Sequence, residues 1–195
     1  LKEIAAPAAA AAADPVEQLP FLDDAQVNAA FGSAAQLCCV AAGPAELAVG
    51  IPGSAGAYRC SAQGSRIQSL LASPAVLKIT HDLKKLAACA GSGVAAGPFF
   101  DTLLAAYLVN AGRSSYRLSD LAWEYLKVAA ADDLPAASAC GFLARLQPLL
   151  QEQLEKAGLA KIFVDLEMPL ALVLAQMEAD GILIDAQRLA ALSRE

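Results

Sequence analysis

Residues 37–60 read LCCVAAGPAELAVGIPGSAGAYRC. This stretch contains three apolar runs, Leu37–Ala42, Leu47–Ile51 and Ala57–Cys60, with glycine- and proline-containing turns between them. Short apolar runs separated by such turns are typical of β-strands, and their close spacing favours an antiparallel meander. The stretch therefore predicts a three-stranded antiparallel unit of a sheet.

Strand and helix patterns alternate in the chain that follows. Runs of apolar residues at strand length or at helical spacing predict further elements: strands at Val76–Thr80 and Phe99–Phe100, and helices at Asp82–Cys89, at Thr102–Val109, from Ser119 or Asp120 onward, and at 135–156. Pro148 predicts a kink or break in the last helix. Strands followed by interleaved helices predict a mixed sheet flanked by helices, in an α/β or α+β domain.

The composition fits a globular chain. Of 195 residues 57% are hydrophobic and 17% charged, which excludes a disordered tail. The formal net charge is −6, opposite in sign to that of a domain that binds DNA or an anionic membrane by charge alone. Polar residues, glycine and proline interrupt the apolar stretches too often for a membrane-spanning helix, so no membrane partner is expected.

The cysteines and the first residues indicate where the chain acts and how it is built. The five cysteines are odd in number and lack CxxC spacing, which favours buried thiols, no zinc site and a cytoplasmic location. Residues 1–16 are rich in alanine and proline and are expected to form a linker. We expect the chain to be a fragment, because it begins with Leu1 and such a linker normally follows another segment.

Two longer segments carry a family resemblance. Residues 99–126, FFDTLLAAYLVNAGRSSYRLSDLAWEYL, resemble the segment after the second exonuclease motif of bacterial DNA polymerase I, a family A polymerase. Residues 158–185, GLAKIFVDLEMPLALVLAQMEADGILID, resemble the junction between the exonuclease-like and polymerase domains of that family. The two segments occur in the family's order.

The resemblance implies a domain plan and partners. It implies a DnaQ-like, RNase H-like 3′–5′ exonuclease domain over 17–157 and the start of a polymerase domain over 158–195. The implied partners are the polymerase domain and an N-terminal 5′ nuclease domain of the same chain, with DNA bound through the complete enzyme. The parent chain is then a DNA-directed DNA polymerase, whose Mg²⁺ is expected in the polymerase domain only; no cofactor is expected to bind this fragment.

The resemblance also identifies the positions of the exonuclease carboxylates. Active members hold two divalent cations with four carboxylates, because Mg²⁺ requires hard oxygen ligands. The matching positions here are Ala41 and Gly43 for the first motif, Leu86 for the second and Ala139 for the third. None of these side chains contains oxygen. The sequence therefore predicts a catalytically inactive exonuclease-like domain that serves as a scaffold for the polymerase.

Two alternatives remain. The first is an active two-metal exonuclease with relocated carboxylates, drawn from Glu46, Asp82, Asp101 and either Asp132 or Asp133. Against it, acids at these positions are typical of helix N-termini and solvated loops. The second alternative is a stand-alone protein-interaction module with the same fold.

Five residues are candidates for contacts with DNA or with a neighbouring domain: Lys84, Lys85, Arg113, Tyr116 and Arg117. Two adjacent lysines on a chain of net negative charge would contribute little to phosphate binding.

Other residues invite a functional reading but have simpler explanations. His81 is the only histidine and is expected to lie on the surface or to cap a helix. Tyr107, Trp123 and Tyr125 recur at helical spacing and are expected to pack in or near the core.

Overall fold

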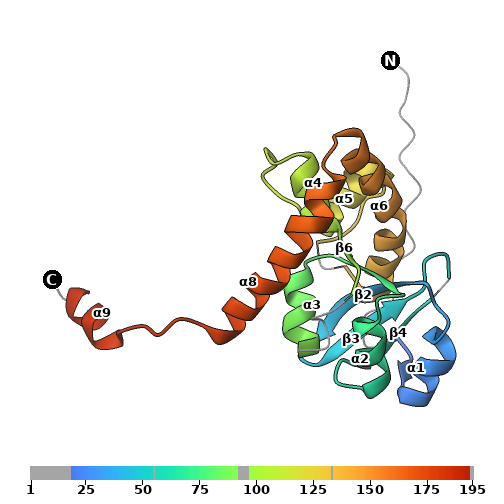
Figure 1. The fold of residues 1–195 in the computed structure, drawn as a ribbon, viewed down its shortest axis with the longest axis horizontal. Helices are drawn as coiled ribbons and strands as arrows, with labels where there is room; N and C mark the ends of the chain where they lie inside the picture. The colour runs from blue at the N-terminus through green and yellow to red at the C-terminus, as the bar shows by residue number, and fades with distance from the viewer. Residues whose placement is uncertain (1–18, 55, 92–96, 133, 194–195) are drawn as a thin grey trace.

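The computed structural model describes residues 19–54, 56–91, 97–132 and 134–193. The expected linker over 1–16 lies outside these residues. The described chain contains a six-stranded mixed sheet with helices on both faces (Figure 1). The strands are β1 (Phe21–Leu22), β2 (Gln36–Gly43), β3 (Glu46–Gly50), β4 (Ala57–Ser61), β5 (Leu77–Thr80) and β6 (Phe99–Asp101).

The strand order across the sheet is β1-β4-β3-β2-β5-β6. Strands β2, β3 and β4 pair antiparallel, which confirms the predicted meander. Strand β5 pairs parallel to β2, β6 pairs parallel to β5, and β1 pairs parallel to β4. The sequence reading missed β1, because two residues are too few to show an alternating pattern.

The helical segments agree with most of the sequence predictions. They are α1 (Asp24–Phe31), α2 (Ser65–Ala72), α3 (Leu83–Ala90), α4 (Thr102–Val109), α5 (Leu118–Leu121), the π-helical turn η3 (Ala122–Leu126), α6 (Ala136–Lys156), α7 (Ala160–Ile162), the π-helical turn η4 (Phe163–Glu167), α8 (Met168–Asp180) and α9 (Ala186–Leu192). Of the predicted kink or break at Pro148, the break is wrong, since α6 continues through this residue, and the kink stays a prediction. Leu146 and Leu150 are fully buried on either side, and this packing holds the helix together.

Alternate residues of the central strands supply the two faces of the sheet. Leu37 and Cys39 of β2 belong to the same apolar cluster as Leu83 and Leu86 of α3. The intervening Cys38 belongs to a second cluster, with residues from the N-terminal half of α6: Ala136, Cys140 and Leu143. This alternation is the two-residue period of a β-strand, so β2 is covered by a helix on each face.

The predicted burial of the cysteines is confirmed for four of the five. Cys38, Cys39, Cys60 and Cys140 are buried, whereas Cys89 is half-buried, and all five are free thiols. Burial raises the pKa of Cys38 and of Cys60 to about 12. These thiols are therefore protonated at neutral pH and act as small apolar side chains.

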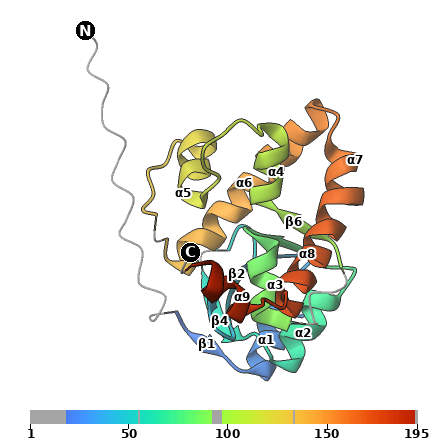
Figure 2. The same cartoon turned by 90° about the vertical axis from the view of Figure 1, so that its left-hand side faces the viewer.

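The C-terminal helices leave the body of the molecule. Helix α8 packs alongside α3 and then extends away, with α9 at its far end (Figure 1). In the view turned by 90°, helices α4, α5 and α6 lie toward one end of the molecule, and α1 and α2 lie at the other (Figure 2). No helix in the described residues has both the length and the apolar content needed to cross a bilayer.

Candidate functional site

The carboxyl ends of β2, β5 and β6 meet at one edge of the sheet, because these three strands are parallel. Helix α3 follows β5 at this edge and α4 follows β6. In α/β sheets, ligands generally bind beyond the carboxyl ends of the parallel strands. This edge is therefore the candidate site, and it is where the resemblance locates the first exonuclease motif.

The four motif positions contain no metal ligand. Ala41 and Gly43 lie at the end of β2, on either side of an irregularity in the pairing with β3. Leu86 in α3 is only 1% exposed, and Ala139 in α6 is 3% exposed. A methyl group, a hydrogen atom or an isobutyl group offers no oxygen to a cation, so these residues do not fit Mg²⁺. Among the described residues, no group of three or more His, Cys, Asp or Glu side chains is arranged to hold a metal ion.

Asp101 is the most deeply buried acid at this edge, 1% exposed at the end of β6. Its carboxylate accepts hydrogen bonds from the backbone N–H groups of Asp82 (3.1 Å), Leu83 (2.6 Å) and Leu103 (2.8 Å). Burial raises the pKa of Asp101, and the three N–H donors oppose that shift. Both carboxylate oxygens are engaged. The capping role expected for Asp101 is confirmed, and one carboxylate serves the N-termini of both α3 and α4.

The other acids proposed as relocated ligands also have partners. Asp82 is the N-cap of α3 and accepts the Lys85 N–H at 3.2 Å, which confirms its expected role. Glu46 forms an ion pair with the guanidinium of Arg59. Asp132 accepts the Ser119 hydroxyl at 3.0 Å and also pairs with an arginine. Asp133 lies outside the described residues.

His81 is neither a surface residue nor a helix cap, so the sequence expectation was wrong. It is half-buried, with Nδ1 2.9 Å from Oγ1 of Thr102, and that hydroxyl donates to the Thr80 carbonyl at 3.1 Å. Burial lowers the pKa of His81 to about 4. This network of His81, Thr80 and Thr102 had no signal in the sequence, because a threonine at a strand end is equally common at the surface.

The candidate contact residues lie at different places. The ammonium of Lys84 bonds to Glu178 of α8 at 2.7 Å. Lys85 is largely exposed and pairs with Asp82 of its own helix turn. Arg117 pairs with two acids that follow it in the chain, Asp120 and Asp132.

Arg113 and Tyr116 form a separate unit. The guanidinium of Arg113 lies 5.8 Å from the centre of the Tyr116 ring and pairs with Glu124. The Tyr116 hydroxyl donates to the Asn110 carbonyl at 2.8 Å. All four charged candidate side chains therefore have acidic partners within the chain, which reduces the positive potential that they offer to DNA.

Two aromatic residues expected to pack are exposed instead. Tyr107 is 44% exposed and Trp123 is 56% exposed, while Tyr125 is half-buried as expected. Tyr107 contacts Tyr116 edge to face, with ring centres 5.7 Å apart. Trp123 lies on the π-helical turn η3, which changes the direction of side chains relative to a regular helix, so helical spacing misplaced it.

Comparison with known proteins gives consistent relatives. No protein-family model matches the chain. The chain is 31% identical to DNA polymerase I of Bacillus subtilis over 118 residues, which are 51% of this chain and 13% of that protein. It is 31% identical to DNA polymerase I of Rhizobium leguminosarum over 153 residues, 67% of this chain and 15% of that protein. The chain is a DNA polymerase I-like protein. The matched region is thus a small part of these curated relatives.

Solved structures agree with the fold of the polymerase I-like chain. NrnC from Brucella melitensis superimposes with a TM-score of 0.61 at 20% identity, covering 82% of this chain and 93% of that one. The POL domain of Pol1 from M. smegmatis, in complex with DNA primer–template and dNTP, gives a TM-score of 0.65 at 24% identity, covering 93% of this chain and 34% of that one. The predicted fold class is confirmed: a mixed sheet flanked by helices, of the RNase H-like type.

Proposed function

We propose that the chain is a catalytically inactive 3′–5′ exonuclease-like domain, with the start of a polymerase domain, that acts as a scaffold for template-directed DNA synthesis by its parent enzyme. The exonuclease-like part covers 17–157 and the polymerase part begins at about 158. The observation that carries the proposal is the donor set at the sheet edge. The motif positions Ala41, Gly43 and Leu86 offer no oxygen, and the nearby Asp101 is already bonded to three N–H groups.

The scaffold role is supported by the C-terminal segment. Exposed apolar side chains concentrate between 162 and 192, among them Val173 (55%), Met177 (61%) and Leu183 (100%). Isolated exposed leucines are ordinary on protein surfaces, but a concentration of this size is typical of an interaction surface. We propose that this surface contacts the polymerase portion of the parent chain, which also contacts the DNA.

A nuclease assay tests the catalytic part of the proposal. The parent chain is incubated with Mg²⁺ or Mn²⁺ and a primer that ends in a mismatched 3′ nucleotide. We expect no EDTA-sensitive release of nucleotides above background, and the same result for Asp82→Ala. The matched control is Glu152→Ala, which removes an exposed acid from α6, away from the sheet edge. EDTA-sensitive cleavage that is lost in Asp82→Ala but kept in Glu152→Ala would establish the active exonuclease with relocated ligands.

A stability measurement tests the scaffold part. Val173→Glu places a charge on the exposed apolar face of α8, and it is expected to lower the melting temperature and the polymerase activity of the parent chain. Ala179→Glu adds the same charge two residues beyond Met177, on a different face of the helix. Equal effects of the two substitutions would contradict the proposal. If Val173→Glu has no effect and the chain is encoded without a polymerase region, the stand-alone interaction module is the better description.

A further inference from the structure

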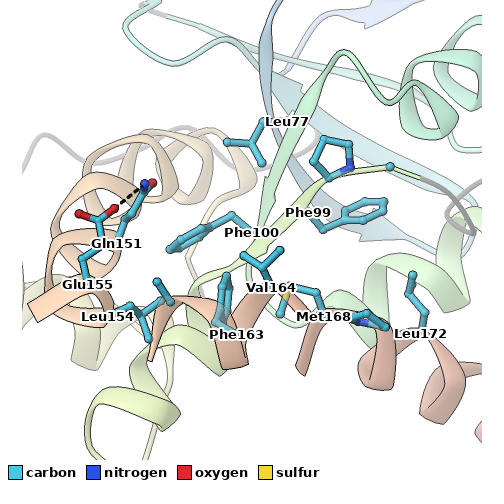
Figure 3. Close-up of a pocket in the computed structure, with 14 residues that line it drawn as sticks. Leu77, Phe99, Phe100, Gln151, Leu154, Glu155, Phe163, Val164, Met168 and Leu172 are labelled. Atoms are coloured by element: carbon cyan, nitrogen blue, oxygen red, sulfur yellow. Dashed lines mark hydrogen bonds between the residues drawn. The ribbon is translucent and has the colours of Figure 1, made fainter. Parts of the chain in front are cut away.

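A cavity lies between the edge strand β6 and the segment that begins with α7 (Figure 3). Its volume is about 480 Å³. The sheet side is formed by Phe99 and Phe100, and the opposite side by Phe163, Val164 and Met168. Small-molecule sites typically enclose about 300 to 1,000 Å³. The cavity is therefore large enough for a molecule with one or two rings.

The walls of the cavity are mainly aromatic and aliphatic. The rings of Phe100 and Phe163 point toward one another, with centres 5.0 Å apart and planes inclined by 54° (Figure 3). Phe163 is only 2% exposed, so the wall is held in place by packing rather than by solvent-facing side chains. Aromatic walls favour flat apolar ligands, because ring edges and faces gain contact area with little loss of side-chain entropy.

The π-helical turn η4 supplies an independent indication. It contributes Phe163 and Val164 to the wall, between the regular helices α7 and α8. A π-turn inserts one residue into the helical repeat, and such turns occur frequently at functional sites.

One side of the cavity is polar and carries a negative charge. Gln151 and Glu155 lie one turn apart on α6, and the Gln151 amide donates to Oε1 of Glu155 at 3.0 Å (Figure 3). Glu155 is the only charged side chain among the described residues that line the cavity. The ammonium of Lys78 lies 4.8 Å from the centre of the Phe99 ring, but Lys78 does not line the cavity. Glu155 is exposed, so its carboxylate lies at the solvent-facing rim of the cavity, where it favours a cation or an N–H donor.

We propose that this cavity binds a flat aromatic molecule that carries an amino group. The rings contact Phe99, Phe100 and Phe163, and the amino group bonds to Glu155. Because the cavity joins the exonuclease-like sheet to the segment at 158–195, the ligand bridges the two parts and stabilises their contact. No relocated carboxylate or polymerase activity is needed for this binding.

Titration of the chain with 1-naphthylmethylamine tests the proposal, with 1-naphthaleneacetate as the probe of opposite charge. We expect saturable binding of the amine, followed by calorimetry and by NMR shifts of Phe163, and at least tenfold weaker binding of the carboxylate. Glu155→Gln is expected to weaken amine binding about threefold, because Glu155 is exposed and exposed ion pairs are weak. Glu152→Gln removes the same charge from the same helix outside the cavity, and it is expected to change nothing.

Two cavity-filling variants complete the test. Ala160→Trp is expected to abolish binding of both probes, and Val164→Trp to do the same in a more exposed part of the wall if the first variant does not fold. Equal affinity for the two probes, or equal effects of Glu155→Gln and Glu152→Gln, would refute the assigned ligand chemistry. Absence of saturable binding by either probe would refute the site.

Discussion

Strand β2 and the neighbouring pair β5–β6 run parallel in one sheet, but only β5 and β6 bury charged side chains as well as apolar ones. β2 buries Leu37, Cys38 and Cys39, and it ends on alanine and glycine. β5 and β6 bury Lys78 and Asp101, less than 2% exposed each. Burying a polar group without a hydrogen-bond partner costs about 1–3 kcal/mol. Lys78 and Asp101 therefore each require such a partner, whereas the apolar side chains of β2 do not.

The difference teaches how to interpret an acid in a nuclease-like fold. Asp101 lies at the edge where the family resemblance locates the exonuclease motifs, but its oxygens are bonded to the N-termini of two helices. The end of β2, where the first motif is expected, has no acid at all. The partners of a carboxylate, rather than its position at the edge, therefore indicate whether it is available to a cation.

The largest expected effect comes from introducing an acid at one of the apolar positions that correspond to the exonuclease motifs. Leu86→Asp places a carboxylate in a fully apolar cluster, and it is expected to lower the free energy of unfolding by about 5 kcal/mol or to prevent folding. Ala41→Asp, at the half-buried end of β2, is the milder companion variant. Urea unfolding measures both. A stable Leu86→Asp protein that binds Mn²⁺ would show that the edge still accommodates a metal site.

The next largest effect is expected at Asp101, the buried acid at the end of β6. Asp101→Ala leaves three backbone N–H groups without their acceptor, so the free energy of unfolding is expected to fall by about 3 kcal/mol. The reference is Asp23→Ala, which removes the exposed cap of α1 and is expected to cost about 1 kcal/mol. If the two losses are equal in urea unfolding at pH 7, Asp101 is not a shared cap.

Local patterns in the sequence were sufficient for most of the fold. The meander follows from apolar runs and turns, and α4 was predicted from Thr102 to Val109 as the structure has it. Asp82 and Asp101 were recognised as caps for the same reason, since a cap is a local interaction. Elements defined by long-range packing were not predictable: β1 has two residues, and the helix continues through Pro148 because Leu146 and Leu150 beside it are buried.

The candidate site was predictable only in its residue types. The absence of carboxylates at Ala41, Gly43 and Leu86 is visible in the sequence, but the double cap by Asp101 joins residues 18 and 19 positions apart. The burial of His81 depends on Thr102, which is 21 positions away. Such contacts form through the pairing of β5 with β6, and no local pattern encodes them.

A smaller effect of opposite sign is expected at Lys78. Burial lowers the pKa of Lys78 from 10.5 to about 8, while its ammonium bonds to the Ser73 carbonyl at 2.8 Å. The unfolded chain therefore holds this proton more tightly, and stability rises with pH between about 8 and 10.5. Lys78→Met is expected to raise the free energy of unfolding by about 2 kcal/mol at pH 7 and to remove its rise with pH. Urea unfolding at pH 7 and pH 10 measures both effects. If Lys78→Met is less stable than the unchanged protein at pH 7, the hydrogen bond to Ser73 outweighs the cost of burying the charge.

His81 is expected to contribute less, because it is only half-buried. Its pKa in the folded chain is about 4, below the ordinary 6.5, so the unfolded state takes up the extra proton. Stability is therefore lost as the pH falls from 6.5 toward 4, by about 1–2 kcal/mol. His81→Gln, which retains a hydrogen-bonding side chain near Thr102, is expected to remove this part of the slope. If the free energy of unfolding changes equally with pH between 4.5 and 7 in the unchanged protein and in His81→Gln, the burial of the ring is contradicted.

The smallest effect concerns the ion pair between Lys84 and Glu178, which joins α3 to α8. Both side chains are more than one third exposed, so a double-mutant cycle with alanine is expected to give a coupling below about 1 kcal/mol. Hydrogen exchange is the more sensitive readout: Lys84→Ala is expected to speed exchange of the α8 amides while global stability hardly changes. Glu152→Ala breaks the matched pair with Lys156 inside α6 and is expected to leave α8 unaffected. Unchanged exchange in Lys84→Ala would show that Met168 and Ala171, which are buried, hold α8 by apolar contact alone.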